Sequence, residues 1–433
     1  MKRITVDFSK VDGKIKPMHA VNNGPTGGKI STGKYFTEAG IPYARLHDSA
    51  FFEGYGGEYS VDVHRIFPNF DADENDPNSY VFGPTDKYLQ NIKNAGTEIF
   101  YRLGAGIEHG YKRGTFPPKD YLKWARICEH IILHYNEGWA DGYHHEIAYW
   151  EIWNEADNFQ ADGSNPCWQG TLEEFVDFYC VSATYLKKRF PALKIGGPSI
   201  AWTGTPLLEM LLKACQERQA PLDFLSYHFY KYTIEQITEN ILYTRNVLDQ
   251  YMFNDTETIL NEWNYVKGWL GDAYRETINT INGLKGASYA LGVMCRAQSL
   301  PVDMLMYYDA RPCSWCGLFN VNTLTPQKPY YSFQAFGELY RLGGNVQPRI
   351  DGDFLYAAAA TNGAKNVLLF TLYDDESEGD RQDVEIVLQN VQGKVSVYLL
   401  DEQKNLEKVA ELEEKSFTLS MRMYSSYLVR VEK

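Results

Sequence analysis

The sequence predicts an α/β fold: a (β/α)8 TIM barrel with a C-terminal antiparallel β-sandwich domain. Between residues 15 and 342, eight short apolar segments alternate with helical segments, which is the chain order of a barrel of parallel strands. From about residue 345 the helical pattern stops, and short β-rich segments separated by Gly, Asp and Asn turns follow. The 433 residues are enough for both units. We expect a catalytic barrel over residues 1–344 and a sandwich over residues 345–433.

The expected elements follow from hydrophobic periodicity. Barrel strands are expected at residues 15–21, 43–46, 98–103, 149–155, 193–196, 222–227, 258–264 and 303–308. Apolar residues three and four positions apart predict the clearest helices, at about residues 121–135, 171–190, 205–219, 234–250, 273–298 and 329–342. Sandwich strands are expected at residues 355–359, 366–372, 383–388, 394–400, 416–421 and 427–431.

Two segments lie outside this alternation. Residues 4–8 alternate in polarity like an edge strand, and we expect residues 1–10 to pair with the sandwich. Residues 50–83 are rich in Gly, Asp, Asn and Pro, which predicts a structureless loop. A loop of this length is typical of a binding loop or a lid.

Two of the expected strands end in a carboxylate beside an amide. They are Tyr149-Trp150-Glu151-Ile152-Trp153-Asn154-Glu155 and Thr258-Ile259-Leu260-Asn261-Glu262-Trp263-Asn264. Buried parallel strands deliver polar groups at their C-terminal ends, so Glu155 and Glu262 would face each other across one pocket. That arrangement breaks glycosidic bonds. Glu151 lies an even number of residues before Glu155 and is interpreted as a structural carboxylate of the barrel interior.

Aromatic residues make up 15% of the chain, and their flat rings can serve as platforms for sugars. Trp263 and Trp315 are candidate platforms in the substrate site, with ordinary core packing as the alternative for each. Glu108 and His109, which follow the strand at 98–103, are further candidates to line the pocket.

At Trp153-Asn154-Glu155 and Asn261-Glu262-Trp263-Asn264 the chain resembles the retaining glycoside hydrolases built on (β/α)8 barrels. The His228-Phe229-Tyr230 end of the sixth strand and the trailing sandwich make it most similar to glycoside hydrolase family 39, which includes β-xylosidases and α-L-iduronidases. The resemblance implies that Glu155 is the acid/base, that Glu262 is the nucleophile and that Asn154 contacts a sugar 2-hydroxyl.

The same resemblance implies roles for four more residues. Tyr230 would donate a hydrogen bond to the nucleophile, and Arg45 would support it from below. His47 and His228 would contact the sugar. For these roles Glu155 must start protonated and Glu262 ionised, and we expect the charge of Glu262 to raise the pKa of Glu155. Their carboxyl groups are expected about 5 Å apart.

The sequence therefore predicts a retaining, β-xylosidase-like glycoside hydrolase acting by double displacement at the non-reducing end of oligosaccharides derived from plant or host polysaccharides. Two alternatives stay open: a catalytically degenerate carbohydrate-binding barrel, and a family member acting on an arabinoside, galactoside or uronide. A uronide would need an added cation near the pocket, for which Lys267 and Arg311 are candidates. The 50–83 loop and the Cys313–Cys316 segment have no counterpart in the resemblance, so the sugar is not determined.

Composition argues against other partners. The net charge of −14 disfavours nucleic acid, whose phosphates attract Lys and Arg. No run of 18 apolar residues could span a membrane, and the first residues do not form a signal peptide. We expect a cytoplasmic protein, or an exported one whose signal is absent from this sequence. Carbohydrate is the expected partner, and self-association into a homo-oligomer stays open.

Cofactors and metals are not expected. A metal-dependent barrel hydrolase would need paired histidines on its first strand, and residues 15–21 offer only His19. Cys313 and Cys316 have CxxC spacing but no second pair to complete a zinc site. The remaining cysteines are expected to be reduced core residues.

Overall fold

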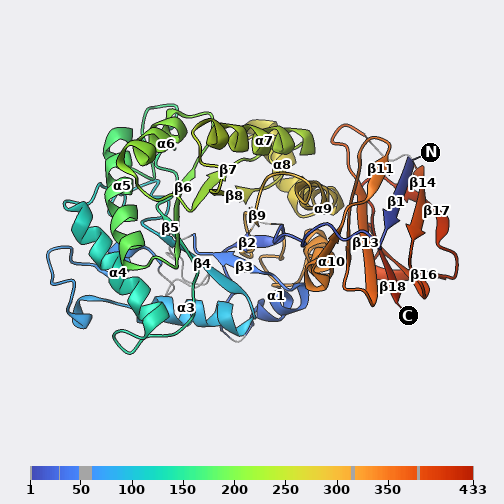
Figure 1. Cartoon of the computed structure of the whole chain (residues 1–433), viewed down its shortest axis with the longest axis horizontal. Helices are drawn as coiled ribbons and strands as arrows, with labels where there is room; N and C mark the ends of the chain where they lie inside the picture. Colours follow the sequence, from blue (N-terminus) through green and yellow to red (C-terminus); the bar gives the residue numbers. More distant parts are fainter. Residues whose placement is uncertain (1, 29, 48–60, 314–316, 378–380, 433) are drawn as a thin grey trace.

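Eight parallel strands close into a barrel, which confirms the fold predicted from the sequence (Figure 1). The computed structural model describes residues 2–28, 30–47, 61–313, 317–377 and 381–432. The barrel strands are β2 (Ala20–Asn22), β3 (Tyr43–Arg45), β4 (Glu98–Leu103), β5 (Tyr149–Ile152), β6 (Lys194–Ile200), β7 (Phe224–His228), β8 (Glu257–Trp263) and β9 (Met304–Tyr307). Strand β2 starts later than predicted, after Pro17, which has no N–H to donate to a strand ladder.

Helices surround the barrel (Figure 1). They are α1 (Gly33–Ala39), α2 (Val63–Ile66), α3 (Gly83–Asn94), α4 (Tyr121–Glu137), α5 (Leu172–Arg189), α6 (Pro206–Arg218), α7 (Ile234–Gln250), α8 (Gly271–Ile281), α9 (Leu284–Ala297) and α10 (Lys328–Leu342). Helix α5 begins with a capping box, in which Thr171 Oγ1 accepts from the Glu174 N–H at 3.1 Å.

Two predictions about these connections were wrong. The helix expected over 273–298 is two helices, because the chain leaves the helical path at Asn282 and Gly283, and glycine is a poor helix former. The described part of the 50–83 loop is not structureless. It contains α2, with buried Val63 and Ile66, and a short 3-10 helix, Pro77–Ser79, capped by the Asp76 side chain. Residues 48–60 lie outside the described residues.

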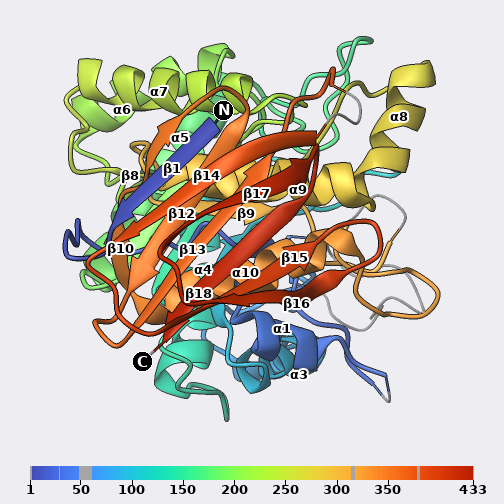
Figure 2. The ribbon, with the colours of Figure 1, turned by 90° about the vertical axis from the view of Figure 1, so that its right-hand side faces the viewer.

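The C-terminal part forms two antiparallel-rich sheets (Figure 2). Their strands are β10 (Gly344–Val346), β11 (Arg349–Asp351), β12 (Leu355–Thr361), β13 (Lys365–Leu372), β14 (Arg381–Gln389), β15 (Lys394–Leu400), β16 (Asn405–Leu412), β17 (Ser416–Arg422) and β18 (Ser426–Glu432). Strand β1 (Lys2–Asp7) joins them, parallel to β14 and antiparallel to β11. The sequence pattern missed β16 because that edge strand is largely exposed and charged.

The larger sheet lies against the barrel through α9 and α10. Strand β12 alternates, as a strand between two layers must: Ala357 and Ala359 face the sandwich core, whereas Ala358 and Ala360 join the barrel core. Alanine side chains allow the helices to approach this sheet closely. The sandwich is therefore held against the side of the barrel that α9 and α10 form.

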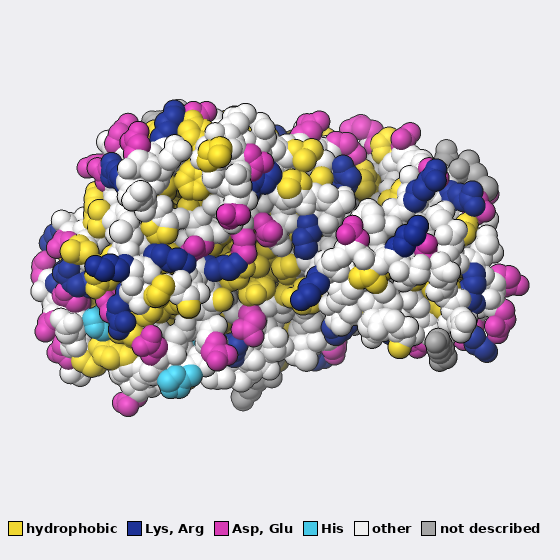
Figure 3. Space-filling model, viewed as in Figure 1, with side chains coloured by type: hydrophobic (Ala, Val, Ile, Leu, Met, Phe, Trp, Pro, Cys, Tyr) yellow, Lys and Arg dark blue, Asp and Glu magenta, His cyan; other side chains and the backbone are white. Residues whose placement is uncertain are grey.

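The exterior is charged. Acidic and basic side chains are interspersed over the face drawn in Figure 3. Among the described residues, no helix is long and apolar enough to cross a membrane. Cys128, Cys167, Cys180, Cys215 and Cys295 are buried and free, and Cys313 is partly exposed. Cys316 lies outside the described residues.

Candidate active site

The segment after β5 presents Asn154 and Glu155 at the mouth of the barrel through an unusual backbone. Trp153 and Glu155 both have positive φ angles, 76° and 49°, in the left-handed region that non-glycine residues rarely adopt. The indole of Trp153 anchors this turn: it packs edge-on against Trp168 and Phe178, and its Nε1–H donates to Cys167 O at 2.9 Å. Glu155 N–H donates to Ser199 O at 2.9 Å.

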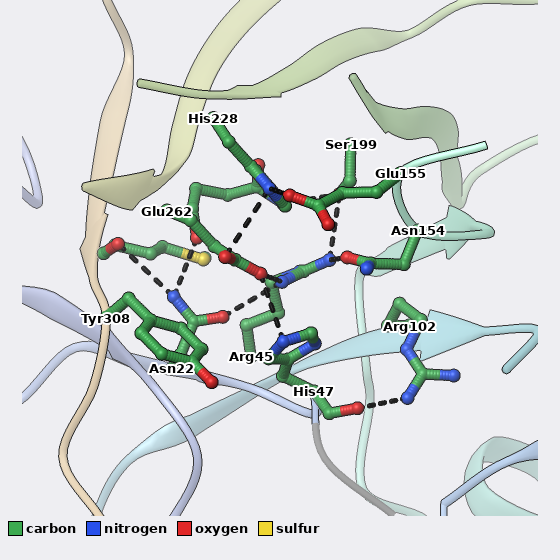
Figure 4. A network of polar contacts seen from close by, with 12 residues as sticks. Asn22, Arg45, His47, Arg102, Asn154, Glu155, Ser199, His228, Glu262 and Tyr308 are labelled. Carbon is green, nitrogen blue, oxygen red and sulfur yellow. Dashed lines mark hydrogen bonds and ion pairs between the residues drawn. The ribbon is translucent and has the colours of Figure 1, made fainter. Parts of the chain in front are cut away.

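Glu155 and Glu262 meet across the barrel mouth (Figure 4). A carboxyl oxygen of each and a ring nitrogen of His228 all lie within 4.8 Å of one another. Nδ1 of His228 is 2.7 Å from Glu155 Oε1 and 3.4 Å from Glu262 Oε2. A separation of about 5 Å lets one carboxyl attack a carbon while the other delivers a proton to the leaving group.

Glu262 lies among hydrogen-bond donors. Arg45 Nη1 donates to its Oε1 at 2.8 Å, and the Tyr230 hydroxyl donates to its Oε2 at 2.6 Å. His47 Nε2 is 3.3 Å from Oε1. Tyr308, which the sequence pattern did not single out, stands edge-on to the rings of both His47 and Tyr230. Both oxygens of Glu262 are therefore fixed in position.

Arg45 is fully buried and distributes its guanidinium over one polar layer (Figure 4). Its partners besides Glu262 are Glu151 Oε2 at 2.6 Å, Asn154 Oδ1 at 2.7 Å, Ser199 Oγ at 2.8 Å and Asn22 Oδ1 at 2.9 Å. Glu151 also accepts from Ser199 and Asn261, so it belongs to the barrel interior, as interpreted from its spacing. Arg45 therefore faces two carboxylates of this layer, Glu151 and Glu262.

Glu155 has mainly neutral neighbours. Asn158 Nδ2 donates to its Oε2 at 2.6 Å, and the Cys167 thiol is 3.8 Å from the same oxygen. Burial raises the pKa of Glu155 above its usual value, and Asn158, Arg45 and Cys167 oppose the rise. The pKa of Glu155 is raised as expected, but the largest cause is desolvation of a carboxyl that is 8% exposed, whereas the prediction named the charge of Glu262.

Burial also raises the pKa of Glu262, which is 4% exposed, but Arg45 and the Tyr230 hydroxyl stabilise its ionised form. Because Glu262 has the direct ion pair with Arg45, we infer that it loses its proton before Glu155 does. Burial lowers the pKa of His228 to about 4, so its imidazole is neutral near neutral pH. Because His228 is neutral and Glu155 still holds its proton, the carboxyl pair carries one negative charge. That charge lies on Glu262, which is ion-paired with Arg45.

Asn154 offers a donor. Its Oδ1 is held by Arg45, whereas its buried Nδ2 has no hydrogen-bond partner in the described part of the chain. His228 Nε2 is also buried without such a partner. Unpaired buried polar groups are costly, so a site that leaves two of them next to the carboxyl pair is suited to a hydroxyl-bearing ligand.

Of the two candidate sugar platforms, Trp263 lies within the described residues. Trp263 is 0% exposed, and its ring packs against Tyr289 of α9 and Tyr307 of β9, so it is a core residue and not a sugar platform. Trp315 lies outside the described residues. Trp269, which the sequence pattern missed, is 55% exposed and stands edge-on to Tyr230 at a centroid distance of 5.4 Å. The sequence feature that could have singled out Trp269 is its place in a loop between two glycines, Gly268 and Gly271.

Other candidates have structural partners. Glu108 accepts from the backbone N–H groups of Arg113, Gly114 and Thr115 and so organises its own loop, whereas His109 is exposed. Lys267 is paired with Glu276 and Asp375. Arg311 is paired with Asp309 and donates to the Tyr308 hydroxyl.

Glu155, His228 and Glu262 are also close enough to one another to hold a metal ion. The guanidinium of Arg45, 2.8 Å from Glu262, already supplies a positive charge at that position. A cation between the carboxyls would be repelled by it, so the arrangement suits acid–base and nucleophilic chemistry better than metal binding.

Comparison with known proteins points to glycosidases. The profile of Glycosyl hydrolases family 39 matches residues 63–267. A β-xylosidase of Geobacillus stearothermophilus is 32% identical over 124 residues, which are 28% of this chain and 23% of that protein. A β-xylosidase of Caldicellulosiruptor saccharolyticus is 26% identical over 247 residues, 53% of this chain and 46% of that protein. The matches thus span less than half the length of either relative.

The fold has solved counterparts as well. The crystal structure of a glucosidase from Croceicoccus marinus superposes with a TM-score of 0.81 and covers 100% of this chain and 99% of that chain. Its sequence identity is 20%, so this likeness concerns the fold alone.

Proposed function

Because the chain belongs to glycoside hydrolase family 39, a retaining family, we propose that it hydrolyses glycosidic bonds by double displacement at Glu262 and Glu155. The observation that carries this proposal is the pair itself: two buried carboxyls within 4.8 Å, one ion-paired with Arg45 and the other not. Such a pair supplies a nucleophile and a proton donor at the same time.

In the first step, Oε of ionised Glu262 forms a bond to the anomeric carbon while the bond to the leaving oxygen breaks. Protonated Glu155 transfers its proton to that oxygen, so the aglycone leaves as a neutral alcohol. The Tyr230 hydroxyl and Arg45 keep Glu262 ionised and aimed before the attack. Asn154 Nδ2 is proposed to donate to the sugar 2-hydroxyl.

In the second step, Glu155 is ionised and removes a proton from a water molecule. The water oxygen attacks the anomeric carbon, the bond to Glu262 breaks, and the sugar is released with its original anomeric configuration. Neutral His228, 2.7 Å from Glu155 Oε1, hydrogen-bonds the carboxyl in both protonation states, because its Nδ1 donates in one tautomer and accepts in the other.

For the substrate, we propose a neutral sugar removed from the non-reducing end of an oligosaccharide, as by the β-xylosidases that the chain resembles. The two cations considered for a uronic acid have carboxylate partners: Lys267 binds Glu276 and Asp375, and Arg311 binds Asp309. A uronide carboxylate would have to displace one of them. Trp269 is proposed as the aromatic platform for the sugar or its aglycone.

The test is turnover on a panel of nitrophenyl glycosides that includes β-xylosides, α-arabinosides, β-galactosides, β-glucosides and β-glucuronides. We expect release of nitrophenol from the xyloside and none from the glucuronide. Binding of xylo-oligosaccharides without turnover of any glycoside would favour the degenerate, carbohydrate-binding alternative.

A further inference from the structure

The loops that follow β7 and β8 form one unit. We call residues 229–232 the β7 loop and residues 264–270 the β8 loop. Lys231 makes a parallel bridge with Tyr265, and the Val266 N–H donates to Lys231 O at 3.2 Å. The Phe229 N–H also donates to the carbonyl oxygen of Glu262 at 3.0 Å. A displacement of either loop would therefore be transmitted to the other.

Asp375 of the sandwich holds the β8 loop. It follows β13, and its side chain is almost fully buried against the barrel. Its Oδ2 accepts from Lys267 Nζ at 3.0 Å, and its Oδ1 accepts from the Tyr265 hydroxyl at 2.9 Å. Lys285 Nζ of α9 lies 2.6 Å from Oδ1. One sandwich carboxylate thus joins two residues of the β8 loop to a barrel helix.

The β7 loop is held from the same side. The hydroxyl of Tyr373, two residues before Asp375, contacts the carbonyl oxygen of Tyr232 and lies 3.3 Å from Asp375 Oδ1. The Tyr289 hydroxyl of α9 donates to Lys231 O at 2.7 Å. Backbone carbonyls of a loop that accept from rigid elements have little freedom to shift.

One residue of each loop links the loops to the carboxyl pair. Trp269 of the β8 loop stands edge-on to Tyr230 of the β7 loop. Tyr230 in turn donates to Glu262 Oε2 at 2.6 Å. A continuous path of contacts therefore runs from Asp375 through the β8 loop and Trp269 to Tyr230 and Glu262.

We propose that Asp375 is a positioning residue for catalysis, which acts from the sandwich by fixing the β7 and β8 loops so that Tyr230 and Glu262 keep their mutual geometry. The inference rests on the proposed function of Glu262. Removing the charge of Asp375 would leave Lys267 and Lys285 close together, with Glu276 and the exposed Glu376 as the remaining partners of Lys267, and the repulsion between the two lysines would act directly on the β8 loop. A displacement of about 1 Å at a reacting group can cost about a hundredfold in rate.

The test compares Asp375→Asn with Glu338→Gln. Glu338 of α10 forms ion pairs with Arg430 of β18 and Lys365 of β13, so it also joins barrel to sandwich, and these partners lie outside both loops. For each purified full-length variant, the pH dependence of kcat, the KM, the Tm and amide hydrogen exchange of residues 229–232 and 264–270 are measured. The groups around Glu262 that bear on its titration are Arg45, His47, Glu155, His228 and Tyr230.

We expect kcat of Asp375→Asn to fall about tenfold or more. Its acidic pH limb should move to higher pH, because a displaced Tyr230 hydroxyl stabilises the Glu262 carboxylate less. Exchange in the two loops should rise. Glu338→Gln should lower Tm while leaving kcat, the acidic limb and loop exchange at the wild-type values. Asp375→Glu should restore part of the rate.

Equal kinetics and equal loop exchange in Asp375→Asn and Glu338→Gln would overturn the proposal. If Asp375→Asn does not fold, Tyr373→Phe replaces it; this variant keeps the ring but loses the hydroxyl at Tyr232, and it should show the same changes in smaller measure. Amide exchange at the wild-type level in both loops of Tyr373→Phe would then overturn the proposal. Amide exchange is independent of turnover, so an inactive wild-type protein would refute the proposed hydrolysis and leave the loop comparison to decide the role of Asp375.

Discussion

The hydroxyl of Tyr230 lies 2.6 Å from Oε2 of Glu262 and lowers the pKa of that carboxyl against the effect of burial. Tyr230→Phe removes this donor and keeps the ring. We expect kcat/KM to fall about a hundredfold, with the acidic limb of the pH–rate profile moving to higher pH, because Glu262 then holds its proton more tightly. Tyr101→Phe is the control, since the buried Tyr101 hydroxyl has no partner in the described part of the chain. An unshifted acidic limb in Tyr230→Phe would contradict this role.

Glu155 is expected to set the basic limb, because only its protonated form can donate to the leaving group. Glu155→Gln should therefore abolish that limb in a profile of kcat/KM against pH. Glu155→Ala should keep much of its first step on aryl glycosides whose leaving group needs no proton, and added azide should rescue its second step with retained configuration. A basic limb that persists in Glu155→Gln would show that another group donates the proton.

Glu262→Ala should lose turnover on every substrate, activated or not, because Glu155 is the other carboxyl of the pair and its proposed role is proton transfer rather than formation of the covalent intermediate. The stereochemical outcome is the sharper test. NMR of the first-formed sugar in the wild-type reaction should show the anomeric configuration of the substrate, as the carboxyl separation implies. An inverted product would defeat the assignment of Glu262 as nucleophile.

Arg45→Lys keeps the positive charge in the barrel interior, but lysine lacks the several N–H donors that the planar guanidinium of Arg45 directs at different acceptors. A lysine ammonium cannot reach Glu151, Glu262 and Asn154 together, so some of these buried acceptors would lose their partner. We expect a loss of about 3 kcal/mol or more in the free energy of unfolding, measured by denaturant titration, together with a fall in kcat. Wild-type stability in this variant would mean that the layer does not depend on the guanidinium.

Substitutions at Trp263 and Trp269 can distinguish a role in core packing from a role in ligand binding. Trp263→Phe should lower stability by about 1–3 kcal/mol and leave KM unchanged, because the ring is buried between Tyr289 and Tyr307. Trp269→Ala should leave the Tm near that of the wild type and raise KM, because an exposed ring at the mouth contributes mainly to binding. The reverse pattern would restore Trp263 as the sugar platform.

Much of the barrel could be predicted from the sequence because its signals are local. An apolar strand that ends in Trp153-Asn154-Glu155 places its polar groups at the mouth of any parallel barrel, and the Thr171–Glu174 capping box marks a helix start without reference to other elements. The positions of Glu155 and Glu262 at the ends of their strands were likewise sufficient to predict that their carboxyl groups face each other.

What only the tertiary structure decided depends on contacts between distant segments. Trp263 and Trp269 differ by six positions and have the same side chain, yet one faces α9 and the other the mouth, because strand direction and loop path fix which way each ring points. The pKa of Glu155 depends mainly on how completely the folded chain removes water from it. Asp375 contacts the β8 loop across 108 residues of sequence, so no local pattern could link them. Periodicity and residue type therefore determined the elements and the chemistry, whereas burial and long-range pairing determined which side chains can act.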